Sequence, residues 1–191
     1  MTISTLTVVN DMLGLLGELP INDLDANHPV IPRAIAHITY ENSVVQAEKW
    51  WFNCETVTLT PQVSGLILLP NDALSADSNT RYPNLAVRGT RLYNLDEATD
   101  KFTEAIKVRL HRLIPFDDAP ITMRAYVAAR AKLAFQASID GDELKTRLLA
   151  SEQTAAFARV NAEHTRNVKA NMFNRPGVQY ILNQMRGTRR Y

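Results

Sequence analysis

The sequence predicts an α+β protein: a discontinuous bundle of about four helices, a small antiparallel β domain inserted into it, and a C-terminal arm. Three observations predict this architecture. Apolar residues recur at helical spacing in the first and last thirds of the chain, they alternate with polar residues in the middle, and the chain end is strongly basic. We expect a helical domain over 1–52 and 115–170, a β domain over 53–114, and an arm over 171–191.

The composition is that of a globular chain. Hydrophobic residues make up 46% and charged residues 21% of 191 residues, enough to bury a core without disulfides. No apolar run approaches the ~20 residues of a membrane span, and the first residues lack the basic n-region and cleavage site of a secretory signal. The single cysteine, Cys54, excludes an intrachain disulfide framework and a multi-cysteine zinc site.

Two helices are predicted before residue 53. The first carries apolar residues at helical spacing from Leu6 to Leu16, with Ser4 or Thr5 as a cap and Gly17 as a stop signal. The second begins near 29–32 and runs to the tryptophan pair. Its end is predicted to form a structural core plug of three aromatic residues, Trp50, Trp51 and Phe52. If Trp51 is buried, replacing it by alanine costs ~3–5 kcal/mol.

The middle of the chain predicts a small sheet. Val57 and Leu59 alternate with threonines, which is typical of a strand, and the apolar run 66–69 is also predicted as a strand. Residues 71–81 have the composition of a loop. A hairpin is predicted around Gly89, and the alternation over 106–110 gives the clearest strand.

Two further helices are predicted after residue 115. Asp117 and Asp118 before Pro120 form a start signal, with the carboxylates capping the helix that follows. That alanine-rich helix ends at the break over 140–142, and a fourth helix with a wide solvent face runs to about Val168.

Sequence motifs predict no catalytic residue, no cofactor site and no metal site, because the usual phosphate, zinc and nucleophile signatures are absent and the four histidines lack ligand spacing. We interpret Cys54 as a small buried apolar residue. The alternative is a catalytic nucleophile paired with a distant histidine. Asp117 and Asp118 could instead form an acid/base pair. Lys107, Arg109 and His111 place a basic stripe on one strand face, which is either solvated or binds an acidic neighbour or nucleic acid.

The formal net charge of +1 is the sum of an acidic N-terminal region and a basic C-terminal region. Residues 1–60 hold two basic and seven acidic residues, whereas residues 164–191 hold six basic residues and no acidic one. Apolar residues are interleaved with these basic residues in the arm, which an idle terminus would not usually carry. We expect the arm to make an ordered contact with a partner, either protein or nucleic acid, since arginine suits both carboxylate and phosphate.

Several short motifs follow one another along the chain. They are Val9-Asn10-Asp11-Met12-Leu13, Gly17-Glu18-Leu19-Pro20, Trp51-Phe52-Asn53, Thr58-Leu59-Thr60-Pro61, Leu74-Ser75, Val87-Arg88-Gly89, Leu92-Tyr93-Asn94-Leu95 and Phe116-Asp117-Asp118-Ala119-Pro120. Their order over about residues 6–135 resembles the tail tubular protein A family of short-tailed bacteriophages.

This resemblance implies a structural virion protein and no enzyme: a head-to-tail adaptor ring, a dodecamer of this chain, that joins the portal protein to a tail nozzle resembling tail tubular protein B. DNA would pass through its channel during ejection without sequence-specific binding. The resemblance implies a place in the virion tail, assembly in the host cytoplasm and no membrane. It also implies that the arm docks on the portal. The expected docking residues are Arg175, Tyr180, Ile181, Leu182, Met185, Arg186, Arg189, Arg190 and Tyr191.

Two other functions are compatible with the residues. A small nucleic-acid-binding protein would use the basic C-terminal tail and show a steep salt dependence. A tail-borne glycan hydrolase would need two carboxylates ~5–10 Å apart in a cleft, and no pair in the sequence stands out as such.

Overall fold

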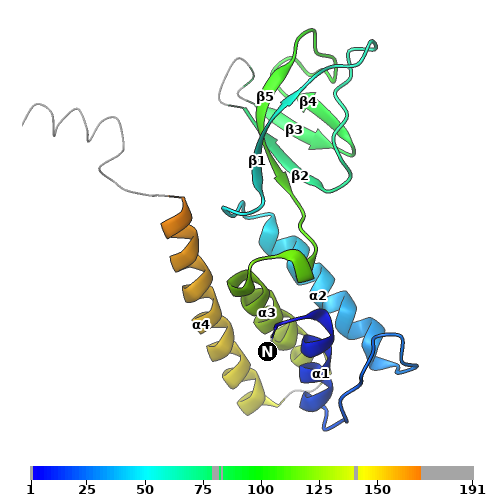
Figure 1. Ribbon diagram of the computed structural model, residues 1–191, viewed down its shortest axis with the longest axis vertical. Coiled ribbons are helices and arrows are strands. Elements are labelled where there is room, and N and C mark those ends of the chain that lie inside the picture. Colours follow the sequence, from blue (N-terminus) through cyan, green and yellow to red (C-terminus); the bar gives the residue numbers. More distant parts are fainter. Residues whose placement is uncertain (1, 79–81, 83, 140–141, 169–191) are drawn as a thin grey trace, which may run out of the picture.

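The computed structural model describes residues 2–78, 82, 84–139 and 142–168, and it has a helical part and a β part at opposite ends (Figure 1). The helices of this described chain are α1 (Thr5–Leu15), α2 (Val30–Gln46), α3 (Ile121–Ile139) and α4 (Glu143–Asn167), with a short 3-10 helix η1 (Phe116–Asp118). The strands are β1 (Cys54–Leu59), β2 (Ala73–Asp77), β3 (Leu85–Arg88), β4 (Arg91–Asn94) and β5 (Ile106–Arg112). The predicted α+β class is therefore confirmed.

Local signals set both ends of α1 and the start of α4. The Ser4 side chain accepts a hydrogen bond from the Thr7 amide at the start of α1, and Gly17 adopts φ 77° just after its end. Asp142 caps α4 in the same way, because its carboxylate accepts from the Lys145 amide at 3.0 Å. The predicted end of α4 is also confirmed, since its C-cap is Val168.

The second helix is shorter than predicted. It ends at Gln46, and Lys49 then adopts a left-handed conformation with φ 66°. This turn brings the indole N–H of Trp50 within 2.7 Å of the Val45 carbonyl oxygen, to which it donates. The Val45 carbonyl, which also accepts from the Glu48 amide at 3.2 Å, thus receives a second hydrogen bond from the tryptophan. The apolar plug lies after the helix instead of in its last turn.

The predicted start of α3 is confirmed, because the helix begins at Ile121 directly after Pro120, but the Asp117 carboxylate caps another helix. Asp117 lies in η1, and its carboxylate accepts hydrogen bonds at 2.8 Å from both the amide and the hydroxyl of Thr5. The acidic side chain therefore stabilises the N-terminus of α1, which is far away in sequence but adjacent in the fold.

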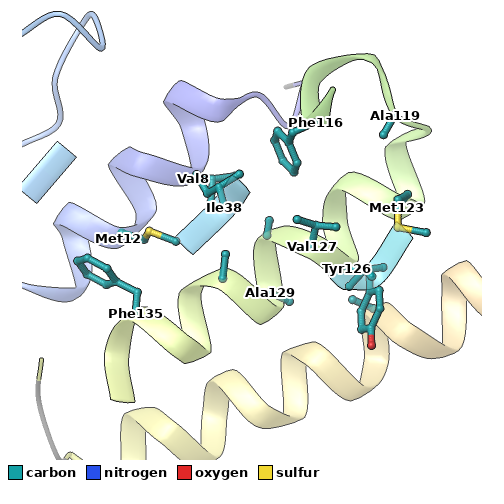
Figure 2. Close-up of a cluster of buried hydrophobic side chains, with 14 of the residues drawn as sticks. Val8, Met12, Ile38, Phe116, Ala119, Met123, Tyr126, Val127, Ala129 and Phe135 are labelled. Carbon is teal, nitrogen blue, oxygen red and sulfur yellow. The ribbon is translucent and has the colours of Figure 1, made fainter. Parts of the chain in front are cut away.

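One hydrophobic core lies in the helical part. Figure 2 shows Val8 and Met12 of α1, Ile38 of α2 and Phe135 of α3 pointing into the same interior. Helix α3 packs against both α2 and α4, and small side chains such as that of Ala129 permit the close approach.

A second core lies in the β part. Strands β1, β5 and β2 form an antiparallel sheet in that order, and β3 pairs with β4 in a separate hairpin. The buried residues between them are Ile67, Leu69, Ala76, Tyr82, Leu92, Phe102, Ile106, Val108 and Leu110. The two cores share no residue, and the domain boundaries given above stay a prediction.

The strand predictions are partly wrong. The hairpin around Gly89 and the strand over 106–110 are confirmed. The run 66–69 is not a strand and makes only isolated bridges. Its apolar character reflects the burial of Ile67 and Leu69 in the core of the β part. The predicted loop 71–81 contains β2, an edge strand whose polar composition gives no alternation signal.

The three aromatic residues of the plug differ in burial. Trp50 is 5% exposed and belongs to the helical core, whereas Trp51 and Phe52 are half-buried against it. The rings of Trp50 and Trp51 meet edge to face with centroids 6.4 Å apart, and the His164 ring of α4 lies 5.3 Å from Trp50. Trp50 therefore links the end of α2 to α4.

We expect Trp50→Ala to lower the free energy of unfolding by ~3–5 kcal/mol, the cost of a large cavity in a core. Trp51→Ala should cost less, because part of that side chain is already in water. Urea denaturation followed by circular dichroism measures both. An equal or larger cost for Trp51→Ala would contradict this ranking.

Candidate functional site: the junction between the helices and the sheet

The chain passes twice between the two parts, through residues 47–53 and 113–115. The side chain of Gln46 joins these two passages. Its amide nitrogen donates to the Ile114 carbonyl oxygen at 2.7 Å, and its amide oxygen accepts from the Ile114 amide at 2.8 Å. The buried glutamine side chain therefore pairs with the backbone of Ile114 as a neighbouring strand would.

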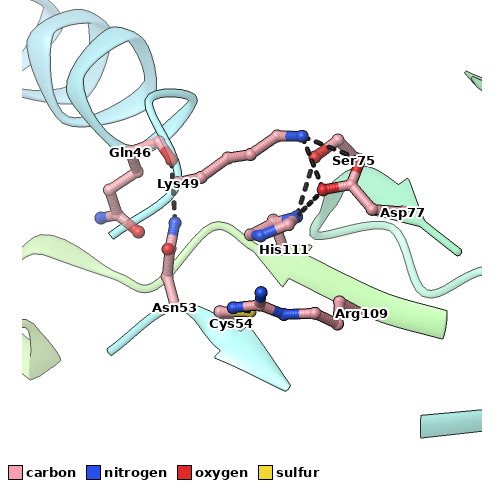
Figure 3. Close-up of polar contacts among 8 residues, drawn as sticks. All are labelled: Gln46, Lys49, Asn53, Cys54, Ser75, Asp77, Arg109 and His111. Carbon is pink, nitrogen blue, oxygen red and sulfur yellow. Dashed lines mark hydrogen bonds and ion pairs between the residues drawn. The ribbon is translucent and has the colours of Figure 1, made fainter. Parts of the chain in front are cut away.

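Two asparagines extend this network. Asn42, one helical turn before Gln46, donates to the same Ile114 carbonyl at 3.0 Å and accepts from the Gln46 amide nitrogen at 2.8 Å. Asn53 donates to the Gln46 backbone carbonyl at 2.8 Å, as Figure 3 shows, and its own carbonyl accepts from the Arg112 amide. Both passages are thus held by one set of hydrogen bonds.

An ion pair ties the end of α2 to the edge strand. The Lys49 ammonium group lies 2.8 and 2.7 Å from the two carboxylate oxygens of Asp77 in β2. The left-handed backbone at Lys49 turns this side chain toward the sheet (Figure 3). Because both groups are partly exposed, this contact contributes orientation more than stability.

The His111 side chain lies beneath this ion pair. It is 3% exposed, and its Nδ1 atom lies 3.0 Å from the Ser75 hydroxyl and 3.8 Å from Asp77. Burial lowers the pKa of His111 below its ordinary value of 6.5, and the Asp77 carboxylate opposes that shift. The neutral imidazole is therefore the form that fits this site.

The predicted basic stripe is only partly present. Lys107 and Arg109 are exposed on β5, but His111 is buried where the end of α2 meets the sheet. A guanidinium nitrogen of Arg109 lies 3.2 Å from the half-buried Cys54 sulfur, so the single cysteine lines this junction.

The structure places the four histidines apart. His28 contacts Glu18 at 2.6 Å, the His37 ring meets Phe135, and His111 and His164 occupy the places given above. Within the described residues, no group of three or more His, Cys, Asp or Glu side chains is arranged to hold a metal ion.

The predicted docking residues, from Arg175 to Tyr191, lie outside the described residues. Their role stays a prediction.

A loop at the far end of the β part carries an exposed apolar side chain. Strand β1 starts at the junction, so the loop over 60–65 lies at the end of the sheet away from the helices (Figure 1). Val63 in that loop is fully exposed.

Sequence reasoning missed most of the junction. Asn42 and Gln46 could have been found, because polar residues four apart on the apolar face of a predicted helix need buried partners. No sequence pattern indicates the contact among Lys49, Asp77 and His111. This contact depends on how the turn after α2 meets the edge strand.

Comparisons with known proteins cover both parts of the chain. The model of one family, described as Tail tubular protein, matches residues 6–174. Tail tubular protein A of Klebsiella phage KP34 is 26% identical over 165 residues, which cover 85% of this chain and 87% of that protein. The match therefore includes the helices, the sheet and the junction between them.

We expect Gln46→Leu to lower the free energy of unfolding by roughly 1–3 kcal/mol, because the Ile114 amide then lacks its partner. Gln62→Leu is the matched control, since the Gln62 side chain is exposed, and it should change stability by less than ~0.5 kcal/mol. Urea denaturation measures both variants. Equal effects of the two would mean that the Gln46 contacts do not hold the junction.

We expect stability to fall as the pH drops from 6.5 through the lowered pKa of His111. The unfolded chain then binds a proton that the folded chain resists, so protonation favours unfolding. Urea denaturation at pH 8 and pH 5 should show a smaller loss for His111→Gln than for the unchanged chain. Burial lowers the pKa of His37 as well, so His37→Gln is a needed comparison. An unchanged pH dependence in His111→Gln would refute this assignment.

Proposed function

Because the chain belongs to the tail tubular protein family and is therefore a phage tail structural protein, we propose that it forms the head-to-tail adaptor ring of a short-tailed phage. In this proposal the ring joins the portal protein to the tail nozzle. The observation that carries the proposal is the family match over residues 6–174, which covers the helical part, the β part and the first residues of the arm. The relative named above carries the name tail tubular protein A.

The fold supports a role as a rigid segment of an assembly. A segment of a stacked assembly must transmit force between its neighbours without changing shape. The junction meets this need, because Gln46 and Asn53 join both chain passages and Lys49 adds a contact to the edge strand. The side chains of this site hold two parts of the chain in register and need no substrate to do so. We propose that the protein acts by assembly and not by catalysis.

The two ends of the chain suit different neighbours. The loop over 60–65, whose turn carries the fully exposed Val63, is proposed to contact a nozzle resembling tail tubular protein B. The basic arm over 171–191 is proposed to dock on the portal through its arginines and apolar residues. Assembly takes place in the host cytoplasm, and the finished ring lies in the virion tail.

The channel is proposed to let DNA pass during ejection. Passage of a whole genome requires weak contacts that read no sequence. The excess of acidic residues over 1–60 agrees with this requirement, because carboxylates repel the phosphate backbone. In the described part of the chain, none of the helices is both long and apolar enough to cross a bilayer.

The test combines this chain with portal protein. Light scattering should find a ring near ~257 kDa, the mass of twelve 21.4 kDa chains, either alone or on the portal. The chain that ends at residue 170 should keep its circular dichroism spectrum and urea midpoint but fail to attach to the portal. A stable monomer that ignores the portal would contradict the adaptor, and attachment of the shortened chain would contradict the role of the arm.

A matched control separates the arm from general positive charge. Lys101→Ala combined with Lys107→Ala removes two exposed cations from the β part. This variant should attach to the portal as the unchanged chain does.

A further inference from the structure

Strand β1 is one edge of the three-stranded sheet. Among the described strands it pairs with β5 alone, in a regular antiparallel register. The Arg112 amide donates to the Asn53 carbonyl oxygen at 2.9 Å, one step before this register begins. Because hydrogen-bonded pairs alternate along an antiparallel ladder, the amides and carbonyls of Cys54, Thr56 and Thr58 point away from β5. These outward backbone groups have no hydrogen-bond partner among the described residues.

Within the described chain, this edge lacks most of the features that usually block strand addition. Proline, lysine or a bulge commonly protects the edge of a sheet. Strand β1 has none of the three, and its one charged residue, Glu55, forms an ion pair with Arg112 at 3.5 Å. The opposite edge differs, because β2 has a register irregularity between Ala73 and Ser75 and lies against β3. Strand β1 is therefore the edge of this sheet that can accept another strand.

The inner face of the sheet at this edge is apolar. Successive side chains of a strand point to opposite faces. Val57 and Leu59 point inward and are partly buried against the core of the β part. Because β1 is the last described strand on this side, the sheet gives these two side chains no neighbour beyond it. Apolar side chains of an added strand would extend the core.

The outer face at this edge is polar and basic. Thr56 lies opposite Arg109 in the register. Thr58 lies opposite Lys107, and all four residues are exposed. Neither cation forms an ion pair with a described residue. The Arg109 guanidinium reaches across to β1 and lies 3.2 Å from the Cys54 sulfur (Figure 3). Its charge is thus about one strand spacing, ~4.8 Å, from any strand added at this edge.

A protein segment fits this edge better than nucleic acid does. Duplex DNA would meet the two cations through its phosphates, but it would leave the outward backbone groups and the flanks of Val57 and Leu59 without partners. An extended segment with alternating side chains would satisfy all of them. Its backbone would pair with β1, its apolar side chains would lie beside the two inward residues, and its carboxylates would lie near the cations.

We propose that β1 binds an extended segment of another protein as an additional antiparallel strand, with apolar side chains on the inner face and acidic side chains on the outer face. Main-chain hydrogen bonds supply the affinity of such a contact, and the alternating side chains supply its specificity. The described strand pairs are all antiparallel, so we assign the same direction to the added strand. This contact is separate from the portal and nozzle contacts proposed above.

Peptide binding to the full chain tests the proposal. The probe is a synthetic peptide in which valine and glutamate alternate, labelled with fluorescein at one end, and fluorescence anisotropy measures its affinity. The matched peptide carries lysine in place of glutamate. We expect the glutamate peptide to bind more tightly by roughly tenfold or more, because only its carboxylates complement Lys107 and Arg109.

Methylation of the peptide amides tests the backbone contact. In an antiparallel added strand, the residues opposite Cys54, Thr56 and Thr58 place their side chains on the outer face, so they are the glutamates, and their amides point toward β1. Methylation of the glutamate amides should therefore abolish binding, whereas methylation of the valine amides should preserve it. Equal effects of the two methylated peptides, or the reverse pattern, would overturn the proposed pairing.

Variants of the chain give the complementary test. Thr56→Pro removes an outward N–H but no bond to β5, a position where an edge strand tolerates proline, so it should keep the urea midpoint and lose peptide binding. Lys107→Ala with Arg109→Ala should weaken binding by roughly tenfold. The matched control, Arg147→Ala with Arg159→Ala, removes two exposed cations of α4 and should leave binding unchanged. If Thr56→Pro unfolds the chain, the methylated peptides decide the question.

Failure of the full chain to bind the glutamate peptide overturns the proposal, and three observations identify the other occupants. Binding of duplex DNA that is lost with Lys107→Ala and Arg109→Ala would assign the basic face to nucleic acid. Peptide binding only by the chain that ends at residue 170 would mean that the C-terminal segment of the same chain covers β1. Loss of the ring in Thr56→Pro, measured by light scattering, would make this edge a contact between copies. A ring that forms normally without peptide binding leaves the adaptor intact.

Discussion

The pairing of the Gln46 side chain with the backbone of Ile114 is the constraint on which the rest of the structure depends. The polypeptide must leave the helical part and return to it, and each passage exposes backbone groups that no helix or strand satisfies. One buried amide supplies both a donor and an acceptor to the returning passage. The end of α2 and the end of β5 are thereby fixed next to each other, and the other contacts of the junction follow from that position.

Several features become understandable from this point. The left-handed backbone at Lys49 changes the direction of the chain within a few residues of Gln46. That turn places Trp50 in the helical core and turns Lys49 toward the sheet, next to His111. The two cores share no residue, so the hydrogen bonds of the junction, together with the packing of Trp50, hold the two parts next to each other.

The sequence was informative where structure follows from nearby residues. Ser4 and Gly17 bound α1, and the alternation from Ile106 to Leu110 identifies β5, because caps and periodicity act over a few positions. The sequence was misleading where a contact between residues far apart in the chain determines the local structure. Asp117 caps a helix more than a hundred residues away in sequence, and β2 is a strand only because β5 pairs with it. Of the site, the tryptophans were visible from the sequence, whereas the glutamine and lysine contacts depend on the tertiary fold.

The closeness of the two passages also bears on how such a protein changes over evolutionary time. From the viewpoint of the helices, everything between Gln46 and Ile114 is a single long loop whose ends meet. The entropy of closing a loop grows only slowly with its length, so the helices tolerate large changes in what it contains. The inserted part is thus free to diverge or to be exchanged as a module, while the helices that carry it keep their packing.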